Sequence, residues 1–339
     1  MDIVNTLPET VWKDFVLRHP AGNIFHTPEM FAVFAAAKGH RPSLWAALDG
    51  RGAVQALLLP VQITLWEGPL RRLTSRAVVY GGVLGNPDSA GQAALKALLE
   101  AYTRHARRRV LFTELRNLSD TAPLQDTLSA CGFVYEGHLN YLVDLSGSPE
   151  DVMRNIGRRT RKHIRRALRK GVVTVRQAAT LREVSVCYAL LRRTYAAARV
   201  PLADESLFRA AFEILKPRGM VSFWLAYVDG EVAATSVELG YRDTLYGWYG
   251  GLDRAHARHT PGELLMWHVL KWGVEQGYGV YDFGGAGKPD EEYGVRGFKA
   301  KFGGELVNFG RYVFTHQPFL LWLSRLGYQT LRRTEFLWK

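Results

Sequence analysis

Hydrophobic and polar positions along the chain form two rows of elements in the same order. Each row opens with an Asp-Gly turn and apolar strand segments: the pair at 49–50 precedes residues 53–66, and the pair at 229–230 precedes residues 231–241. Asp-Gly favours a tight turn because glycine adopts positive φ angles at little cost. We therefore predict that both halves begin with a hairpin-like pair of strands.

Four further elements repeat in both rows after this pair. They are an apolar strand, an amphipathic helix, a short β-rich strand, and a short helix with a final strand. Because order and spacing agree across six elements, we predict an internal duplication. The elements lie at 78–85, 92–106, 109–117 and 128–145 in the first row, and at 244–252, 262–276, 278–286 and 298–314 in the second.

This order of elements predicts an α/β (α+β) fold with helices packed on a mixed sheet. A doubly wound nucleotide-binding fold is not expected, since the sequence has no G-x-G-x-x-G after a first strand and no P-loop motif. Three additional helices precede the second row, at 149–170, 180–198 and 204–216.

The domain boundary is predicted in the short Gly/Ser/Pro linker at 145–149. We therefore expect a first domain, 1–146, and a second domain with a leading basic helix, 147–314. The remainder, 315–339, forms a tail in which Trp, Phe and Leu alternate with Arg and Lys. That composition is typical of a helix at a membrane interface, although a helix packed on the protein's own core fits equally well.

Composition narrows the partners without choosing one. The 339 residues include 44 Lys+Arg against 32 Asp+Glu, for a net charge of +12, which favours RNA, phosphate-rich small molecules or anionic lipid. Cys131 and Cys187 lie far apart and outside any Cys/His cluster, as expected in a reducing compartment. The first ten residues lack a signal-peptide pattern, and no stretch reaches about 18 apolar residues. We expect a cytoplasmic protein, with possible peripheral contact at the inner membrane face.

The densest cationic cluster lies on the predicted helix 149–170. Like charges four residues apart on a helix cost about 0.2–0.5 kcal/mol per pair, so a sequence with several such pairs favours a bound anion. Contact with phosphates is the first hypothesis, and a solvated basic face is the alternative. The residues are Arg154, Arg158, Arg159, Arg161, Lys162, Arg165, Arg166, Arg169 and Lys170.

A second candidate site follows the strand 278–286. Asp282 precedes Phe283-Gly284-Gly285, and glycine lets a ligand approach the backbone closely. Lys299 and Lys301 lie two residues apart near a predicted helix end, so one of them should point inward. A turn with a surface lysine pair is the alternative.

Two further groups are candidates by position. Thr260, Pro261 and Glu263 have the spacing of a capping box, and a helix N-terminus is a plausible anion site, although capping alone accounts for these residues. Glu114 lies at the strand end equivalent to Asp282, where it is either a general base or an ion-pair partner of Arg116. No histidine has metal-ligand spacing and no G-x-S-x-G motif is present.

Taken together, these features resemble the FemAB family of peptidoglycan bridge-forming aminoacyltransferases over nearly the whole chain. The resemblance rests on the tandem repeat, the basic segment 158–172, the Tyr281-Asp282-Phe283-Gly284-Gly285 strand end and the Phe298-Lys299-x-x-Phe302-Gly303-Gly304 segment. It implies two tandem GNAT-like (acyl-CoA N-acyltransferase) domains. It also implies aminoacyl-tRNA as donor, a lipid- or nucleotide-linked muramyl peptide as acceptor, and no cofactor.

The resemblance also assigns roles to residues. Lys299 would stabilise the negative charge that develops at the reacting carbonyl, and the basic helix would meet tRNA or acceptor phosphates. Lys38 is the nearest match to a first-domain lysine that holds acceptor phosphate, and the helical arm of some members is absent. We expect Lys299, Asp282 and Tyr249 as catalytic residues. The expected substrate-binding residues are Arg199, Lys38, Glu114, Arg116, Arg161, Lys162, Arg165 and Lys301.

Three hypotheses follow from the sequence. The first is transfer of an amino acid from aminoacyl-tRNA to an amine of a peptidoglycan precursor. The second is an acyl-CoA-dependent GNAT-type N-acyltransferase in exopolysaccharide or lipid synthesis. The third is a non-enzymatic RNA- or membrane-binding protein on a transferase scaffold.

Overall fold

The computed structural model describes residues 1–64, 68, 71–324 and 326, and these form two compact units. The first unit comprises Met1–Ala35, Gly39–Gly137 and the described residues from Phe309 onward, and the second comprises Ala36–Lys38 and His138–Asn308. This division differs from the predicted domains 1–146 and 147–314, because the chain changes unit after Gly137 and again after Asn308.

The first unit contains two sheets, with strand orders β1-β3-β4-β7 and β2-β5-β6-β8-β17-β9. Within the predicted apolar segment 53–66, the described residues form β4 and β5, which Leu59 and Pro60 separate and which belong to different sheets. Helix α4 packs on β3 and β4 through a fully buried face that includes Leu95 and Leu98. The elements are β1 (Asp2–Val4), α1 (Glu9–Arg18), α2 (Pro28–Ala36), β2 (His40–Pro42), β3 (Trp45–Leu48), β4 (Val54–Leu58), β5 (Val61–Thr64), α3 (Arg71–Thr74), β6 (Ser75–Gly81), β7 (Leu84–Gly85), α4 (Ser89–Ala106), β8 (Phe112–Asn117), α5 (Gln125–Ala130), β9 (Val134–Glu136) and β17 (Arg311–Thr315).

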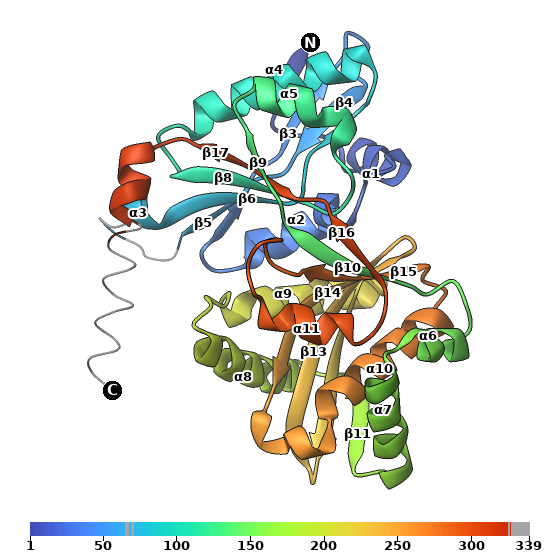
Figure 1. Ribbon diagram of the computed structural model, residues 1–339. Coiled ribbons are helices and arrows are strands. Elements are labelled where there is room, and N and C mark those ends of the chain that lie inside the picture. The colour runs from blue at the N-terminus through green and yellow to red at the C-terminus, as the bar shows by residue number, and fades with distance from the viewer. Residues whose placement is uncertain (65–67, 69–70, 325, 327–339) are drawn as a thin grey trace. The chain divides into compact units, whose positions relative to one another are not determined.

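The second unit is built on a seven-stranded sheet of order β11-β12-β13-β14-β15-β10-β16. Figure 1 shows the helices that accompany this sheet. The elements are β10 (Leu139–Asp144), α6 (Pro149–Asn155), α7 (Arg158–Lys170), β11 (Val173–Gln177), α8 (Leu181–Ala198), α9 (Glu205–Leu215), β12 (Val221–Val228), β13 (Glu231–Tyr241), β14 (Thr244–Leu252), α10 (Pro261–Glu275), β15 (Val280–Gly285), α11 (Gly294–Ala300) and β16 (Glu305–Asn308).

Both faces of this sheet are covered, so its central strands are apolar on both sides. Phe223 of β12 contacts Phe212 of α9, whereas the next residue, Trp224, contacts Trp272 of α10. Successive residues of a strand point to opposite faces, so α9 packs on one face and α10 on the other, and α8 contacts α9 and β13. This arrangement explains why the strands of the second row lack a clear polar face.

The two units share the same strand order around their parallel strand pair. In the first unit the order β5-β6-β8-β17-β9 contains the parallel pair β6/β8, and in the second the order β13-β14-β15-β10-β16 contains the parallel pair β14/β15. The predicted duplication is therefore confirmed. However, β10, the final strand of the first row, pairs in the second unit's sheet, while β17, the final strand of the second row, pairs in the first unit's sheet. The two rows have exchanged one strand.

The basic segment forms a helix with a narrow buried face. The predicted helix 149–170 divides into α6 and α7 at Ile156-Gly157. In α7, Thr160, Ile164 and Ala167 are buried, and the helix packs on α10 and β11. The charged side chains occupy the rest of its surface, as the sequence predicts.

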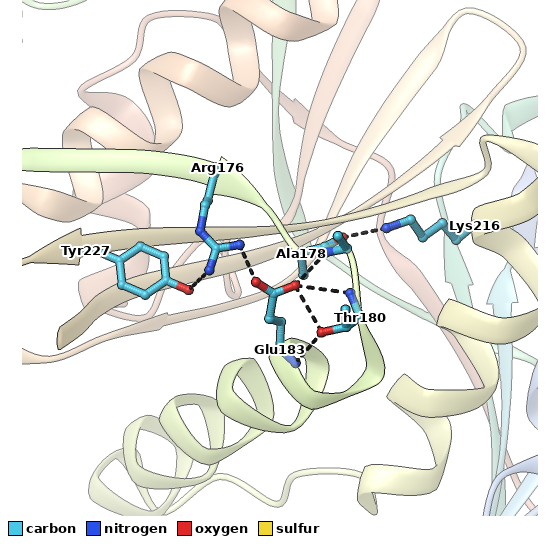
Figure 2. Close-up of polar contacts among 7 residues, drawn as sticks. Arg176, Ala178, Thr180, Glu183, Lys216 and Tyr227 are labelled. Atoms are coloured by element: carbon cyan, nitrogen blue, oxygen red, sulfur yellow. Dashed lines mark hydrogen bonds and ion pairs between the residues drawn. The ribbon is translucent and has the colours of Figure 1, made fainter. Parts of the chain in front are cut away.

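The start of α8 is fixed by a network of polar contacts (Figure 2). Thr180 Oγ1 accepts a hydrogen bond from the Glu183 N–H at 3.3 Å, and Glu183 accepts from the N–H groups of Ala179 and Thr180 at 2.8 and 3.1 Å. Arg176 of β11 pairs with the same carboxylate. The capping box therefore joins β11 to α8 as well as capping the helix.

Removing this cap gives a measurable loss of stability. Thr180→Ala is expected to lower the free energy of unfolding by about 1 kcal/mol, whereas Thr180→Ser keeps the hydroxyl acceptor and should change it little. The backbone N–H of Ala179 and the Arg176 pair lower the pKa of Glu183 to about 2. The contribution of the ionised Glu183 carboxylate to the free energy of unfolding is thus fully present above pH 4.5 and is lost as the pH falls from 4.5 to 2. Urea unfolding of both variants at pH 7 and pH 3 checks this, and equal stabilities at pH 7 would contradict it.

Candidate functional site

The two parallel strands of the second unit part before they end. Strands β14 and β15 pair at three positions, from Thr244↔Val280 to Tyr246↔Asp282. Beyond them β14 stays paired with β13 and β15 stays paired with β10. In the first unit, by contrast, β6 and β8 pair at five positions, up to their last residues. The facing main-chain edges beyond Tyr246 and Asp282 therefore do not bond to each other, and they form the centre of the candidate site.

Lys299 lies at the end of β15 and is bound there by the backbone. Its ammonium group donates to the carbonyl oxygens of Phe283, Gly284 and Gly285 at 2.5, 3.1 and 2.7 Å. The side chain is only 8% exposed, and three carbonyls account for all three donors of an ammonium group. Lys301, two residues later, is exposed, so the prediction that one lysine points inward is confirmed.

Asp282 is buried at the same strand end and accepts several hydrogen bonds. It accepts from the Gly284 N–H at 2.7 Å and from the Asn140 side-chain amide at 3.2 and 3.3 Å. Asn140 belongs to the exchanged strand β10, and sequence analysis missed it because nothing near it in sequence indicates that β10 lies beside β15. The Asp282 carboxyl, the Asn140 amide and the Lys299 ammonium group are thus all buried at the end of β15.

The charges of this pair are strongly affected by burial. Burial raises the pKa of Asp282 to about 6, against the lowering effects of the Gly284 N–H and Lys299. Burial lowers the pKa of Lys299 to about 8, against the raising effect of Asp282. Both groups therefore titrate within about one pH unit of neutrality, which is common at functional sites.

Aromatic side chains surround Tyr249 on β14. Its ring lies 4.8 Å from Phe208, 5.0 Å from Trp248 and 5.8 Å from Tyr195, measured between ring centroids. Burial raises the pKa of Tyr195 to about 12, so its hydroxyl stays protonated. Arg199, exposed, ends α8 in the left-handed conformation with φ 54°. Tyr249 and Arg199 remain candidates by position.

The start of α10 differs from the prediction. Pro261 occupies the first turn as expected, but Thr260 adopts φ 54° and its side chain does not cap the helix. Thr260 Oγ1 donates instead to its neighbour's carbonyl, His259 O, at 2.8 Å. Glu263 pairs with Lys301 at 3.0 Å. The predicted capping box is therefore wrong, because the left-handed backbone at Thr260 turns its hydroxyl away from the helix N–H groups.

The cationic helix α7 begins beside the Lys299 segment. The Gly157 N–H, just before α7, donates to Lys301 O at 2.9 Å. Arg161 donates to Arg154 O at 2.6 Å, while Lys162 and Arg165 are exposed. Within the described part of the chain, no carboxylate lies within ion-pair distance of a Lys or Arg of α7. Thirteen residues of helix extend roughly 20 Å, so α7 presents an uncompensated cationic surface that starts at the site.

Three further predicted residues, Glu114, Arg116 and Lys38, have partners of their own. In the first unit, Glu114 pairs with Arg116 at 2.8 Å and with Arg311 at 2.6 Å. Burial raises its pKa, but the two guanidinium groups outweigh burial and hold the pKa at about 2. The ion-pair alternative is therefore what the structure shows for Glu114. Lys38 is exposed, and its backbone N–H donates to Ser206 Oγ at 2.8 Å.

A second buried carboxyl lies near the parted strands and was missed. Glu238 of β13 is 1% exposed, and its Oε2 accepts a hydrogen bond from the Tyr281 hydroxyl at 3.0 Å. Its Oε1 is buried without a hydrogen-bond partner. The only sequence signal is a glutamate inside the apolar run 231–241, which is unusual because buried carboxyls cost free energy unless they are paired.

Other chemistries find little support in the described residues. No group of three or more His, Cys, Asp or Glu side chains there could hold a metal ion. Both cysteines are free, and burial raises the pKa of Cys187 to about 12. Across the same residues, no helix combines the length and apolar character needed to cross a membrane.

Similarity to known proteins lies mainly in the fold. The acetyltransferase (GNAT) domain family matches residues 154–294. The chain is similar to the crystal structure of FemX, with TM-score 0.72 and 16% identity over 96% of this chain and 100% of that one. It is also similar to a tandem GNAT protein from the clavulanic acid biosynthesis pathway (TM-score 0.58, 14% identity, 93% and 98% covered) and to L-PGS from Bacillus licheniformis (0.55, 15%, 95% and 97%).

No curated protein sequence matches the chain. The family match lies wholly within the second unit, and all three structures are less than 25% identical, so the likeness concerns architecture. It agrees with the duplicated strand order and the parallel pair in each unit. The chain therefore has the mixed α/β fold of the tandem GNAT proteins.

Proposed function

We propose that this protein transfers an amino acid from aminoacyl-tRNA to an amine of a lipid-linked or nucleotide-linked muramyl peptide. The observation that favours a polyanionic donor is the hydrogen bond from the Gly157 N–H, at the start of α7, to the carbonyl oxygen of Lys301, two residues after Lys299. A nucleic acid bound along α7 by its phosphates would bring its end to the Lys299 segment. Phosphate contacts dominate such binding and need no sequence-specific groove.

The chemistry asks for positioning and charge. An aminoacyl ester is already activated, so a deprotonated amine needs alignment, which supplies several kcal/mol. Lys299 places a positive charge at the parted strands, where it would stabilise negative charge on the reacting carbonyl oxygen. Because its three donors already bind carbonyls, it acts through its field or by releasing one of them. Asp282, which precedes Phe283 on β15, favours the charged form of Lys299 because its negative charge raises the pKa of the lysine.

An acyl-CoA-dependent N-acyltransferase in exopolysaccharide or lipid synthesis is the second candidate. The parting of β14 and β15 favours it, because the facing main-chain edges suit an extended donor that contains amides. The start of α10 opposes it. A helix N-terminus binds phosphate through free N–H groups, whereas here Pro261 lacks one and Glu263 adds negative charge to the first turn.

The tail is proposed as a peripheral membrane contact, consistent with a lipid-linked acceptor. Residues 318–324 are helical, with Phe319 and Trp322 exposed. Leu321 is buried, and Ser324 Oγ donates to Leu73 O at 2.7 Å. One side of this short helix therefore packs on the first unit and the other presents aromatic rings. The rest of the predicted tail lies outside the described residues.

The donor assay decides between these functions. Purified protein is supplied with charged tRNA or acetyl-CoA and with lipid-linked muramyl pentapeptide, with and without ribonuclease. We expect transfer from charged tRNA that ribonuclease abolishes. Ribonuclease-insensitive transfer from acetyl-CoA would replace the first function by the second. No transfer from either donor would favour a non-enzymatic binding protein.

The acceptor is tested in the same assay. One similar structure is titled the C-terminal domain of a putative lysylphosphatidylglycerol synthetase from Agrobacterium fabrum (TM-score 0.55, 12% identity), so phosphatidylglycerol vesicles form a second acceptor arm. We expect the labelled amino acid on the muramyl peptide amine, and label on the lipid alone would reassign the acceptor.

A further inference from the structure

Glu238 and Tyr281 form a buried polar pair that the proposed roles of Lys299 and Asp282 do not use. Tyr281 is 2% exposed and Glu238 is 1% exposed. The Tyr281 hydroxyl donates to Glu238 Oε2 at 3.0 Å and lies 3.9 Å from Met266 Sδ of α10. The pair thus lies on the α10 face of the sheet. Asp282, the next residue along β15, points to the opposite face.

The sequence around the pair makes room for it. A Cβ atom at Gly247 would lie 2.5 Å from the Tyr281 hydroxyl, so only glycine lets this hydroxyl reach Glu238. In the antiparallel pair β13/β14, Gly247 lies opposite Glu238, and the register shifts between Val237 and Glu238. Gly247 is also the first residue of β14 beyond the parallel pairs with β15. The Tyr281 hydroxyl therefore lies at the point where the two strands part.

One oxygen of the carboxyl lacks a well-aligned hydrogen bond. Glu238 Oε1 and the hydroxyl oxygen of Ser236, two residues earlier, are both buried without a hydrogen bond of good geometry, although the Ser236 hydroxyl lies near enough to lower the pKa of Glu238. A buried polar atom without a partner is costly, and glutamine or methionine would fill the same space without burying a charge. The poorly bonded Oε1 leaves room for a proton on this carboxyl, while Oε2 accepts the hydrogen bond of Tyr281.

Resting on the proposed acyl transfer, we infer that Glu238 and Tyr281 accept the proton released when the acceptor amine attacks. The N–H bond breaks and its proton goes to the Tyr281 hydroxyl oxygen, while the tyrosine's own proton moves to Glu238 Oε2. The nitrogen pair forms the new C–N bond, and the leaving oxygen departs with the pair of the broken C–O bond. Glu238 then returns the proton to that oxygen through Tyr281. Tyr281 meets the substrate, and Glu238 acts through it as a positioning residue.

The titratable surroundings agree with this direction of transfer. Burial raises the pKa of Glu238 to about 7, against the lowering effects of Ser236 and Tyr281. Burial and Glu238 raise the pKa of Tyr281, and Asp282 and Tyr246 raise it further. The contact from α10 is Met266, which does not titrate. The carboxyl therefore exchanges a proton near neutral pH, while the tyrosine stays neutral between transfers.

The test compares three isosteric variants with whichever donor the wild-type protein uses. Glu238→Gln and Tyr281→Phe are expected to lower kcat by on the order of 10²-fold or more, and to remove the rise of kcat/KM with pH around pH 7. Tyr278→Phe deletes another tyrosine hydroxyl in the same unit and should leave both unchanged. A Glu238→Gln variant that is folded and keeps the wild-type kcat and pH profile would overturn the inference.

Two further measurements keep the outcome decisive. If Glu238→Gln does not fold, Glu238→Asp takes its place because it retains a titratable carboxyl. This variant should keep the rise of kcat/KM with pH around pH 7 and have a lower kcat. Loss of that rise would count against the proposed pair. If the wild type transfers nothing, the proposed function fails by itself. Infrared difference spectra of wild type minus Glu238→Gln should still show a protonated carboxyl at pH 5.5 that disappears by pH 8.5. Absence of that band would overturn the inference separately.

Discussion

Replacing Lys299 with methionine is expected to lower kcat by about 10²–10³-fold, the usual effect of removing one group that stabilises transition-state charge. Methionine keeps the length of the side chain and loses its charge and donors. The carbonyl oxygens of Phe283, Gly284 and Gly285 then lose their partner, at a cost of about 1–3 kcal/mol for an unsatisfied buried group. Single-turnover rates and urea unfolding measure the two effects independently.

The control for this change is Lys271→Met. Lys271 belongs to the same unit, on α10, and pairs at 3.5 Å with Glu275 on the surface. Exposed pairs contribute little to stability, so this variant should match the wild type in both measurements. If Lys299→Met is destabilised but retains the wild-type kcat, Lys299 only fastens the strand end and the proposed charge stabilisation is wrong.

Neutralising α7 is expected to weaken donor binding without slowing the chemical step. The triple variant Arg161→Gln, Lys162→Gln, Arg165→Gln removes three cationic groups from a surface without paired carboxylates. We expect the KM for charged tRNA to rise on the order of tenfold to a hundredfold at unchanged kcat. The dependence of log K on log salt should become shallower by about 2 to 3, since each lost phosphate contact removes about 0.7–0.9. Filter binding between 50 and 200 mM salt provides the measurement.

A matched control separates local contact from net charge. Arg104, Arg107 and Arg108 are exposed at the end of α4 in the first unit. Their replacement with glutamine changes the net charge equally, and we expect no change in KM and no change in slope. If both triple variants weaken binding to the same extent, the protein attracts tRNA by its overall charge and α7 has no special role. A weaker affinity for anionic vesicles alone would assign α7 to the membrane.

Much of the local structure could be predicted from the sequence, because element type depends on the spacing of apolar residues. The strand 244–252 and the helices near 180–198 and 262–276 agree closely with β14, α8 and α10. The opposite orientations of Lys299 and Lys301 follow from their separation of two residues at a helix end. Asp282 could be recognised because Gly284 and Gly285 follow it. These features depend on residues near one another in the chain.

Other features depend on segments far apart in sequence. The partner of a strand is fixed by main-chain hydrogen bonds, which are the same for every residue type, so the pattern of β10 or β17 does not say which sheet it joins. For that reason the predicted boundary at 146/147 differs from the change of unit at 137/138, and Asn140 was not foreseen beside Asp282. The failure of Thr260 as a cap arises from its backbone conformation.

The sequence by itself determined the duplication, the kinds of elements and the residues at the end of β15, because these depend on local spacing and on the special backbone of glycine. The tertiary structure alone decided the exchange of β10 and β17, the parting of β14 from β15 and the pairing of Glu238 with Tyr281. Those contacts join residues distant in the chain, so the local spacing of apolar residues does not specify them.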